Sequence, residues 1–162
     1  MQNTQQDMAD GDVRSTLKAM CMVVLAARDQ MIDIQNGLMK GPGKWWNLFR
    51  KFDYAEENRK LAELHGKMDR IAEDLYEMQS SVGPKDSLAT DMHSVLVGYL
   101  GALIETLEAL ERNTAGLANV AESYKNKTYT FADNKKDMEA VNDATDKYVK
   151  ISSVLEELYH QL

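Results

Sequence analysis

Apolar residues recur along most of the chain at alternating steps of three and four, the spacing that places them on one face of an α-helix. Polar or glycine- and proline-containing stretches, "KGPG", "SSVGP" and "YKNKTYTFADN", interrupt this pattern at three places. Four apolar stripes lie between the interruptions. They consist of Leu17, Met20, Val24, Ala27, Met31, Ile34 and Leu38; of Tyr54, Leu61, Leu64, Met68, Ile71, Leu75, Met78 and Val82; of Leu88, Met92, Leu96, Tyr99, Leu103, Leu107, Leu110, Leu117, Val120 and Tyr124; and of Met138, Val141, Thr145, Tyr148, Ile151, Leu155, Leu158 and Leu162.

The stripes predict four helices, over residues 12–40, 44–82, 86–125 and 131–162. Asp12 or Ser15 could cap the first helix, and Asp86 or Ser87 the third. Each stripe must be buried against another helix, and short connections make neighbouring helices antiparallel. The sequence therefore predicts an all-α, antiparallel up-down four-helix bundle with long amphipathic helices, in a single domain over 12–162. A three-helix bundle whose first helix packs against a second chain is the alternative.

The first eleven residues are polar and acidic, and we expect them to form a disordered tail. They lack the basic and apolar regions of a signal peptide. The longest uninterrupted apolar runs, Ala19–Ala27 and Val95–Ile104, are about half the ~20 residues that a membrane-spanning helix needs. We therefore expect a soluble, cytoplasmic protein, with secretion that uses no cleaved signal left open.

The net charge and the single cysteine argue against a nucleic-acid partner and against a disulfide-stabilised fold. The 162-residue chain carries a formal net charge of −7, and an acidic surface repels phosphate backbones, so nucleic acid is not expected as a partner. The single cysteine, Cys21, rules out a disulfide within the chain and is read as a small buried hydrophobe. Gly98 and Gly101 lie inside the third helix, where we expect a neighbouring backbone or the ring of Trp45 or Trp46 to approach closely.

No catalytic constellation is found in the sequence. Helical bundles can hold di-iron centres, which need two Glu-x-x-His motifs and two further glutamates. This chain has one such motif, Glu157 to His160, close to its end. A metal-dependent enzyme of the ferritin-like type is therefore an unfavoured alternative, and we assign no catalytic, cofactor-binding or metal-ligating residue and no cofactor.

The stretch "GPGKWWNLFRKF" differs from the rest of the chain because it joins aromatic and basic residues in an otherwise acidic protein. Three interpretations stay open: a plug of aromatic rings at one end of the bundle, a protein interface, and a hook for anionic membranes. Tryptophan and arginine are common at interface hot spots, and tryptophan also suits the membrane surface. The candidate interaction residues are Trp45, Trp46, Phe49, Arg50, Lys51 and Phe52.

Two segments resemble known families. "KFDYAEENRKLAELHGKMDRIAEDL" resembles the last helix of the cell-death four-helix domains, such as the executioner bundle of mixed-lineage kinase-like proteins and fungal HeLo domains, and this resemblance implies action at membranes. "LANVAESYKNKTYTFAD" is similar to the second helix of small helical proteins exported by type VII secretion, although the Trp-x-Gly turn of that family is replaced here by "GKWWN".

The expected function is that of a non-enzymatic bundle acting through protein–protein interaction, as an adaptor, a scaffold or a self-assembling component. The partner would be another protein or a second copy of the chain. A membrane-interacting or membrane-perturbing bundle that uses the stretch from Trp45 to Phe52 is the alternative.

Overall fold

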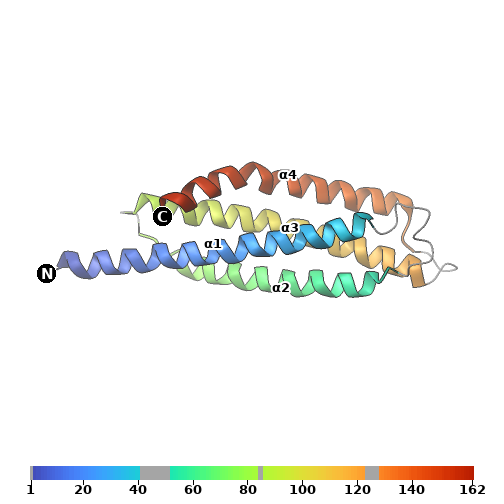
Figure 1. Cartoon of the computed structure of the whole chain (residues 1–162), viewed down its shortest axis with the longest axis horizontal. Helices are drawn as coiled ribbons and strands as arrows, with labels where there is room; N and C mark the ends of the chain where they lie inside the picture. The colour runs from blue at the N-terminus through green and yellow to red at the C-terminus, as the bar shows by residue number, and fades with distance from the viewer. Residues whose placement is uncertain (1, 41–51, 84–85, 123–127) are drawn as a thin grey trace.

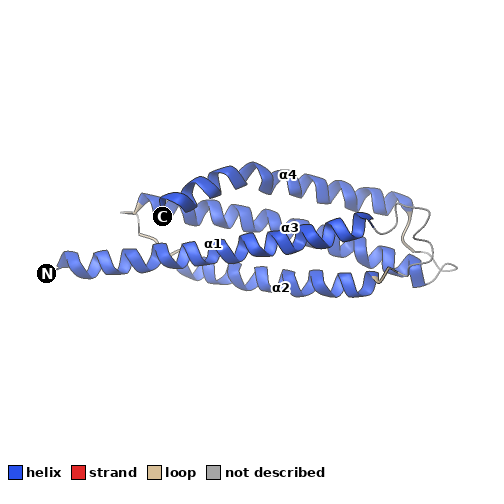
Figure 2. Cartoon of the chain, viewed as in Figure 1, coloured by secondary structure: helices blue, strands red, loops and turns tan. Residues whose placement is uncertain are grey.

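The protein is described by a computed structural model that covers residues 2–40, 52–83, 86–122 and 128–162. It contains four helices: α1 (Gln2–Lys40), α2 (Tyr54–Met78), α3 (Ser87–Glu122) and α4 (Phe131–Gln161). Successive helices run in opposite directions along one long axis (Figure 1), and no strand occurs among the described residues (Figure 2). The predicted antiparallel four-helix bundle is therefore confirmed.

Helix α3 is the centre of the bundle, since it contacts each of the other three helices. It supplies more buried residues than any other described helix, including Leu96, Tyr99, Leu103 and Leu107, all at most 1% exposed. Helix α1 packs against α2 and α3 and reaches α4 through longer side chains, such as Lys18, whose Nζ lies 5.0 Å from the centre of the Tyr159 ring. The alternative with α1 packed only on a second chain is thus wrong.

The predicted stripes form the core. Every stripe residue whose burial is described is buried or half-buried, and none is exposed. Cys21 is also fully buried, next to the stripe of α1. Burial of these stripes is what holds the helices together, because helices are marginal in isolation and gain most of their stability from packing.

Three of the helices begin at recognisable caps. Asp53 accepts a hydrogen bond from the backbone N–H of Glu56 at the start of α2, and Asp86 accepts one from Ala89 at the start of α3, as predicted. At the start of α4, Thr130 and Asp133 form a reciprocal capping box.

The helix boundaries depart from the prediction mainly at α1 and α2. Helix α1 begins at Gln2, not near Asp12, so the predicted tail is helical; Asp12 and Ser15 lie inside the helix and do not cap it. Gln, Met and Ala favour helix and no proline intervenes, so a helix anchored further along extends through this segment. Its first turns project beyond the other helices (Figure 1).

Helix α2 begins at Tyr54 and not at residue 44, because Phe52 and Asp53 are not helical and Asp53 caps the helix. It ends at Met78, before the expected residue 82. Helix α3 begins one residue after its cap Asp86 and ends at Glu122, and the expected extension to residue 125 lies outside the described residues. Helix α4 matches its expected bounds to within a residue.

No described residue approaches Gly98 or Gly101 as closely as expected, and Trp45 and Trp46 lie outside the described residues. Both glycines are exposed; among the described atoms, a Cβ added at Gly101 would meet none within 4 Å, and one at Gly98 would meet only Ile151 Cδ1, at 3.9 Å. Helix α3 tolerates them because its opposite face is anchored in the core.

Among the described residues, α3 is the one helix whose length and composition would allow it to cross a membrane. The sequence reading, based on uninterrupted apolar runs, gave no such helix. The central position of α3 accounts for this composition, since a helix that contacts three others must be apolar on several sides.

Candidate interaction site

The aromatic-basic stretch is described at one of its six candidate residues. Phe52 is half-buried and packs against the core, and its ring centre lies 4.8 Å from that of Tyr54. The two rings and Ala118 of α3 line part of a groove of about 480 Å³ at this end of the bundle. Trp45, Trp46, Phe49, Arg50 and Lys51 lie outside the described residues.

The outer face of α1 carries exposed apolar side chains, which the sequence pattern alone did not identify residue by residue. Met22 and Val23 are 54% and 53% exposed, and Ala19 and Ala26 are exposed beside them. The inner face of the same segment is buried through Cys21 and its neighbours. The run Ala19–Ala27 is therefore apolar on both faces, which a helix in contact with a partner on each side would require. That all-round apolar composition was the signal in the sequence.

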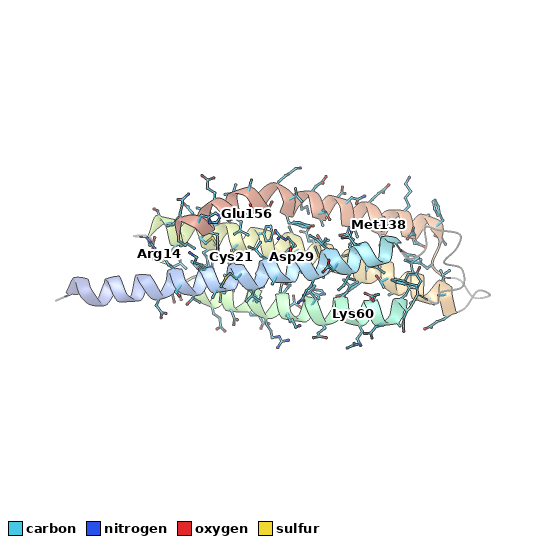
Figure 3. All side chains as sticks on the ribbon, in the orientation of Figure 1. Arg14, Cys21, Asp29, Lys60, Met138 and Glu156 are labelled. Atoms are coloured by element: carbon cyan, nitrogen blue, oxygen red, sulfur yellow. The ribbon has the colours of Figure 1, made fainter. Side chains whose placement is uncertain are left out.

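Helices α1 and α2 form a groove beside this face. It has a volume of about 470 Å³ and is lined by Val23 and Ala26 of α1 and by Lys67, Arg70 and Ile71 of α2, among others. A second groove continues it toward the other end of the helices and shares three lining residues with it, Gln30, Leu64 and Lys67. Lys60, which lines this second groove, is labelled on α2 in Figure 3. The lining of both grooves combines apolar side chains with charged ones.

A third groove lies between α2 and α3. Its lining includes Tyr76, which is 76% exposed, and His93 and Val97 of α3. His93 Nε2 lies 2.8 Å from the backbone oxygen of Leu75 in the last turn of α2. With its proton on Nε2, the imidazole donates to a carbonyl that has no partner within the helix. His93 thus has a structural task at the side of a groove of about 530 Å³.

A polar network joins α3 to α4 at the end of the bundle where α4 begins. The amide nitrogen of Asn113, which is 3% exposed, donates to the Tyr129 hydroxyl at 3.1 Å and to Asn134 Oδ1 at 2.7 Å. The Tyr129 hydroxyl in turn donates to Asp137 Oδ2 at 2.7 Å. Burial and the hydrogen bond with Asp137 raise the pKa of Tyr129 to about 12, so this phenol stays protonated at neutral pH.

The sequence treated this region only as a polar break. The pattern Thr-x-x-Asp at Thr130 to Asp133 was a usable signal for the start of α4. The pairing of Tyr129 with Asn113 has no such signal, because it depends on which face of α3 the returning chain meets. The network fixes a corner of the fold.

The three histidines are engaged separately. His65 Nδ1 lies 3.0 Å from Glu111 Oε1, His93 contacts the Leu75 carbonyl, and the ring of His160 packs edge-on against Tyr159. In the part of the chain that is described, no three His, Cys, Asp or Glu side chains are grouped as a metal ion would require.

The chain matches no protein-family model, and neither a curated protein nor a solved structure is significantly similar to it. The two local resemblances in the sequence have no counterpart in these comparisons.

Proposed function

We propose that this protein is a non-enzymatic helical bundle that acts through protein–protein contact, as an adaptor, a scaffold or a self-assembling component. The observation that carries the proposal is the outer face of α1. Met22 and Val23 are each more than half exposed in the middle of a helix whose other face is in the core. Contiguous exposed apolar residues are typical of interaction surfaces, whereas singly scattered ones are ordinary, and here four such residues adjoin a groove.

A photo-crosslinking experiment tests the proposal in cells of the native host. A photoreactive amino acid is placed at position 23 and, as a matched control, at position 149 on α4, because Val149 is a valine of nearly equal exposure, 55%. We expect discrete adducts with protein from position 23 and few from position 149. Adducts that are absent at position 23, or equally abundant at both positions, would contradict the proposal.

A second candidate function is membrane interaction, which the aromatic-basic stretch favours. Both tryptophans of the chain lie in that stretch, so tryptophan fluorescence reports on it selectively. The first proposal predicts no spectral change when anionic vesicles are added. A blue shift that disappears at high salt, together with release of an entrapped dye, would favour the membrane function instead.

A further inference from the structure

The apolar face of α1 has an internal symmetry. Its four exposed residues, Ala19, Met22, Val23 and Ala26, are spaced by three, one and three positions. The spacing is the same when it is read in either direction, and its midpoint falls between Met22 and Val23. A second α1 helix running in the opposite direction would therefore present the same arrangement, with Met22 opposite Val23 and Ala19 opposite Ala26.

The neighbouring face of α2 has a matching symmetry of charge. Lys67, Arg70, Asp74 and Glu77 are all exposed, and spacings of three, four and three place them on one side of the helix. Two basic residues precede two acidic ones, and the midpoint of the four is residue 72. Reversal of the helix exchanges the signs, so that Lys67 would face Glu77 and Arg70 would face Asp74.

The two basic side chains of this set make only weak contacts within their own helix. Arg70 donates its Nε proton to the Gly66 carbonyl at 3.0 Å, and Lys67 pairs with Glu63 one turn away, at 3.2 Å. Both contacts are within α2 and exposed, and such pairs are worth at most about 1 kcal/mol each. A partner helix could therefore engage these side chains with little loss.

The apolar set of α1 and the charged set of α2 lie on the same side of the bundle and at the same position along its long axis. Val23, Ala26, Lys67 and Arg70 line one groove, together with Ile71. Because α1 and α2 are antiparallel, Val23 lies at the same end of this groove as Ile71. The midpoint of the apolar set is thus level with residue 72, the midpoint of the charged set.

We propose that this face binds the same face of a second copy of the chain, about a two-fold axis at the level of Met22 and residue 72. The two α1 helices would pack antiparallel through their apolar sets, and the two α2 helices would lie beside each other with opposite charges matched. This inference rests on the proposed function and names its partner. An interface of this kind uses one surface patch twice, which is why self-complementarity is the expected signature.

Other arrangements do not use both sets. A parallel pair would place the two α2 helices on opposite sides of the α1 pair and leave their charges unmatched. Each copy carries a net charge of −7, so association also needs a local match that offsets the overall repulsion. In the proposed pairing Asp12 would face Asp33 of the second copy, but about 16 Å from the midpoint, where crossing helices diverge.

The mass of the purified full-length chain in solution tests this inference, by sedimentation velocity or light scattering. We expect the wild-type chain to have twice the monomer mass of 18.3 kDa, Val23→Glu to have the monomer mass, and Val149→Glu to remain a dimer. Circular dichroism shows whether each variant keeps its helices. A wild-type chain that stays monomeric at high concentration would overturn the inference, as would equal dissociation by both substitutions.

A charge exchange tests the antiparallel pairing. Arg70→Glu should weaken the dimer by about tenfold, because it places like charges opposite each other at two equivalent positions. Adding Asp74→Arg to the same chain should restore the dimer, since each exchanged residue meets its exchanged partner on the other copy. A double variant as weak as the single one would contradict the two-fold arrangement.

The photo-crosslink at position 23 separates this inference from the proposed function. If the wild-type chain is monomeric and position 23 crosslinks to a different protein, the second copy is wrong and the proposed function stands. If position 23 gives no adduct, the proposed function fails as well.

Discussion

Arg14 of α1 donates two hydrogen bonds to the Asp86 carboxylate, from Nε to Oδ2 at 2.6 Å and from Nη2 to Oδ1 at 2.8 Å. Asp86 is at the same time the cap of α3, because its Oδ1 accepts the Ala89 backbone N–H at 3.1 Å. One carboxylate thus fixes the first turn of the central helix and joins it to α1. Figure 3 shows Arg14 on α1, and this pair ties α1 to the end of the bundle where α3 begins.

Substitutions at Asp86 should separate its two tasks. Asp86→Ala removes both the cap and the acceptor for Arg14, and should lower the free energy of unfolding by about 2 kcal/mol. Asp86→Asn keeps a good cap but loses the charge, and should cost about 1 kcal/mol, as should Arg14→Ala. Urea denaturation measures these differences. Equal losses for Asp86→Ala and Asp86→Asn would show that the cap adds nothing.

The same pair predicts a dependence on pH. The hydrogen bonds from Arg14 hold the pKa of Asp86 below its usual value of 3.8, so the ionised carboxylate stabilises the folded state. This contribution is complete above the unfolded pKa and is lost as the pH falls through the lower folded pKa. The stability difference between wild type and Asp86→Asn should therefore be constant from pH 7 to about 5 and shrink below that. A difference that does not change down to pH 2 would contradict the role of the charge.

Gly116 predicts an unusual response to alanine. A Cβ at this position would lie 2.3 Å from the Tyr129 ring, which hydrogen bonds to Asn113 and Asp137 hold in place. Gly116→Ala should therefore destabilise the protein, although alanine favours helix by about 1 kcal/mol. Gly101→Ala is the matched control, because it lies in the same helix with no atom within 4 Å of its Cβ, and it should stabilise. If both substitutions stabilise, Tyr129 does not pack on α3 as described.

Burial depth distinguishes two residues that the sequence treated alike. Leu103 and Ile71 both belong to predicted stripes, and truncation of a fully buried leucine or isoleucine to alanine costs about 2–5 kcal/mol. Leu103 is 1% exposed and should show that loss, whereas Ile71 is only half-buried and should lose less. Val97→Ala, on the exposed side of α3, is the control and should change the free energy of unfolding by about 0.5 kcal/mol or less. Similar losses at Leu103 and Val97 would mean that α3 is rotated from its described orientation.

Cys21 should be unreactive in the folded protein. It is fully buried, and burial raises the pKa of its thiol to about 11, so thiolate is scarce at pH 8. A thiol reagent should modify one equivalent at once in urea but only slowly in buffer, at a rate limited by unfolding. Rapid modification in buffer would show that α1 detaches readily from the bundle.

The period of the apolar stripes was enough to predict the fold. The stripes of all four helices lie in the core, and the cap at Asp86 was readable because Asp favours that position. Local spacing carries this information, since it fixes which residues share a helix face. The sequence could not place Tyr129 against Gly116 or Arg14 against Asp86, because these contacts join distant segments through the relative rotation of whole helices.

The candidate site shows the same division. The run Ala19–Ala27 was visible as apolar, but only packing shows that Met22 and Val23 stay outside while Cys21 and Val24 go inside. The composition of the aromatic-basic stretch made its residues candidates for interaction. One of them, Phe52, packs against the core. Composition therefore indicated where unusual residues lie, and packing indicated which of them remain available for contact.

Methionine oxidation tests most directly whether the outer face of α1 is a contact surface. Met22 is 54% exposed, Met31 on the inner face of α1 is 1% exposed, and Tyr76 on α2 is 76% exposed. Hydroxyl radicals are applied to the dilute protein and then to its assembled state, whether a dimer or a complex with another protein. In the dilute protein, we predict that Met22 is oxidised far faster than Met31. On assembly, Met22 should lose most of this reactivity, whereas the reactivity of Tyr76 should not change. A Met22 that is as slow as Met31 in the dilute protein, or as reactive after assembly as before it, would contradict a contact surface on α1.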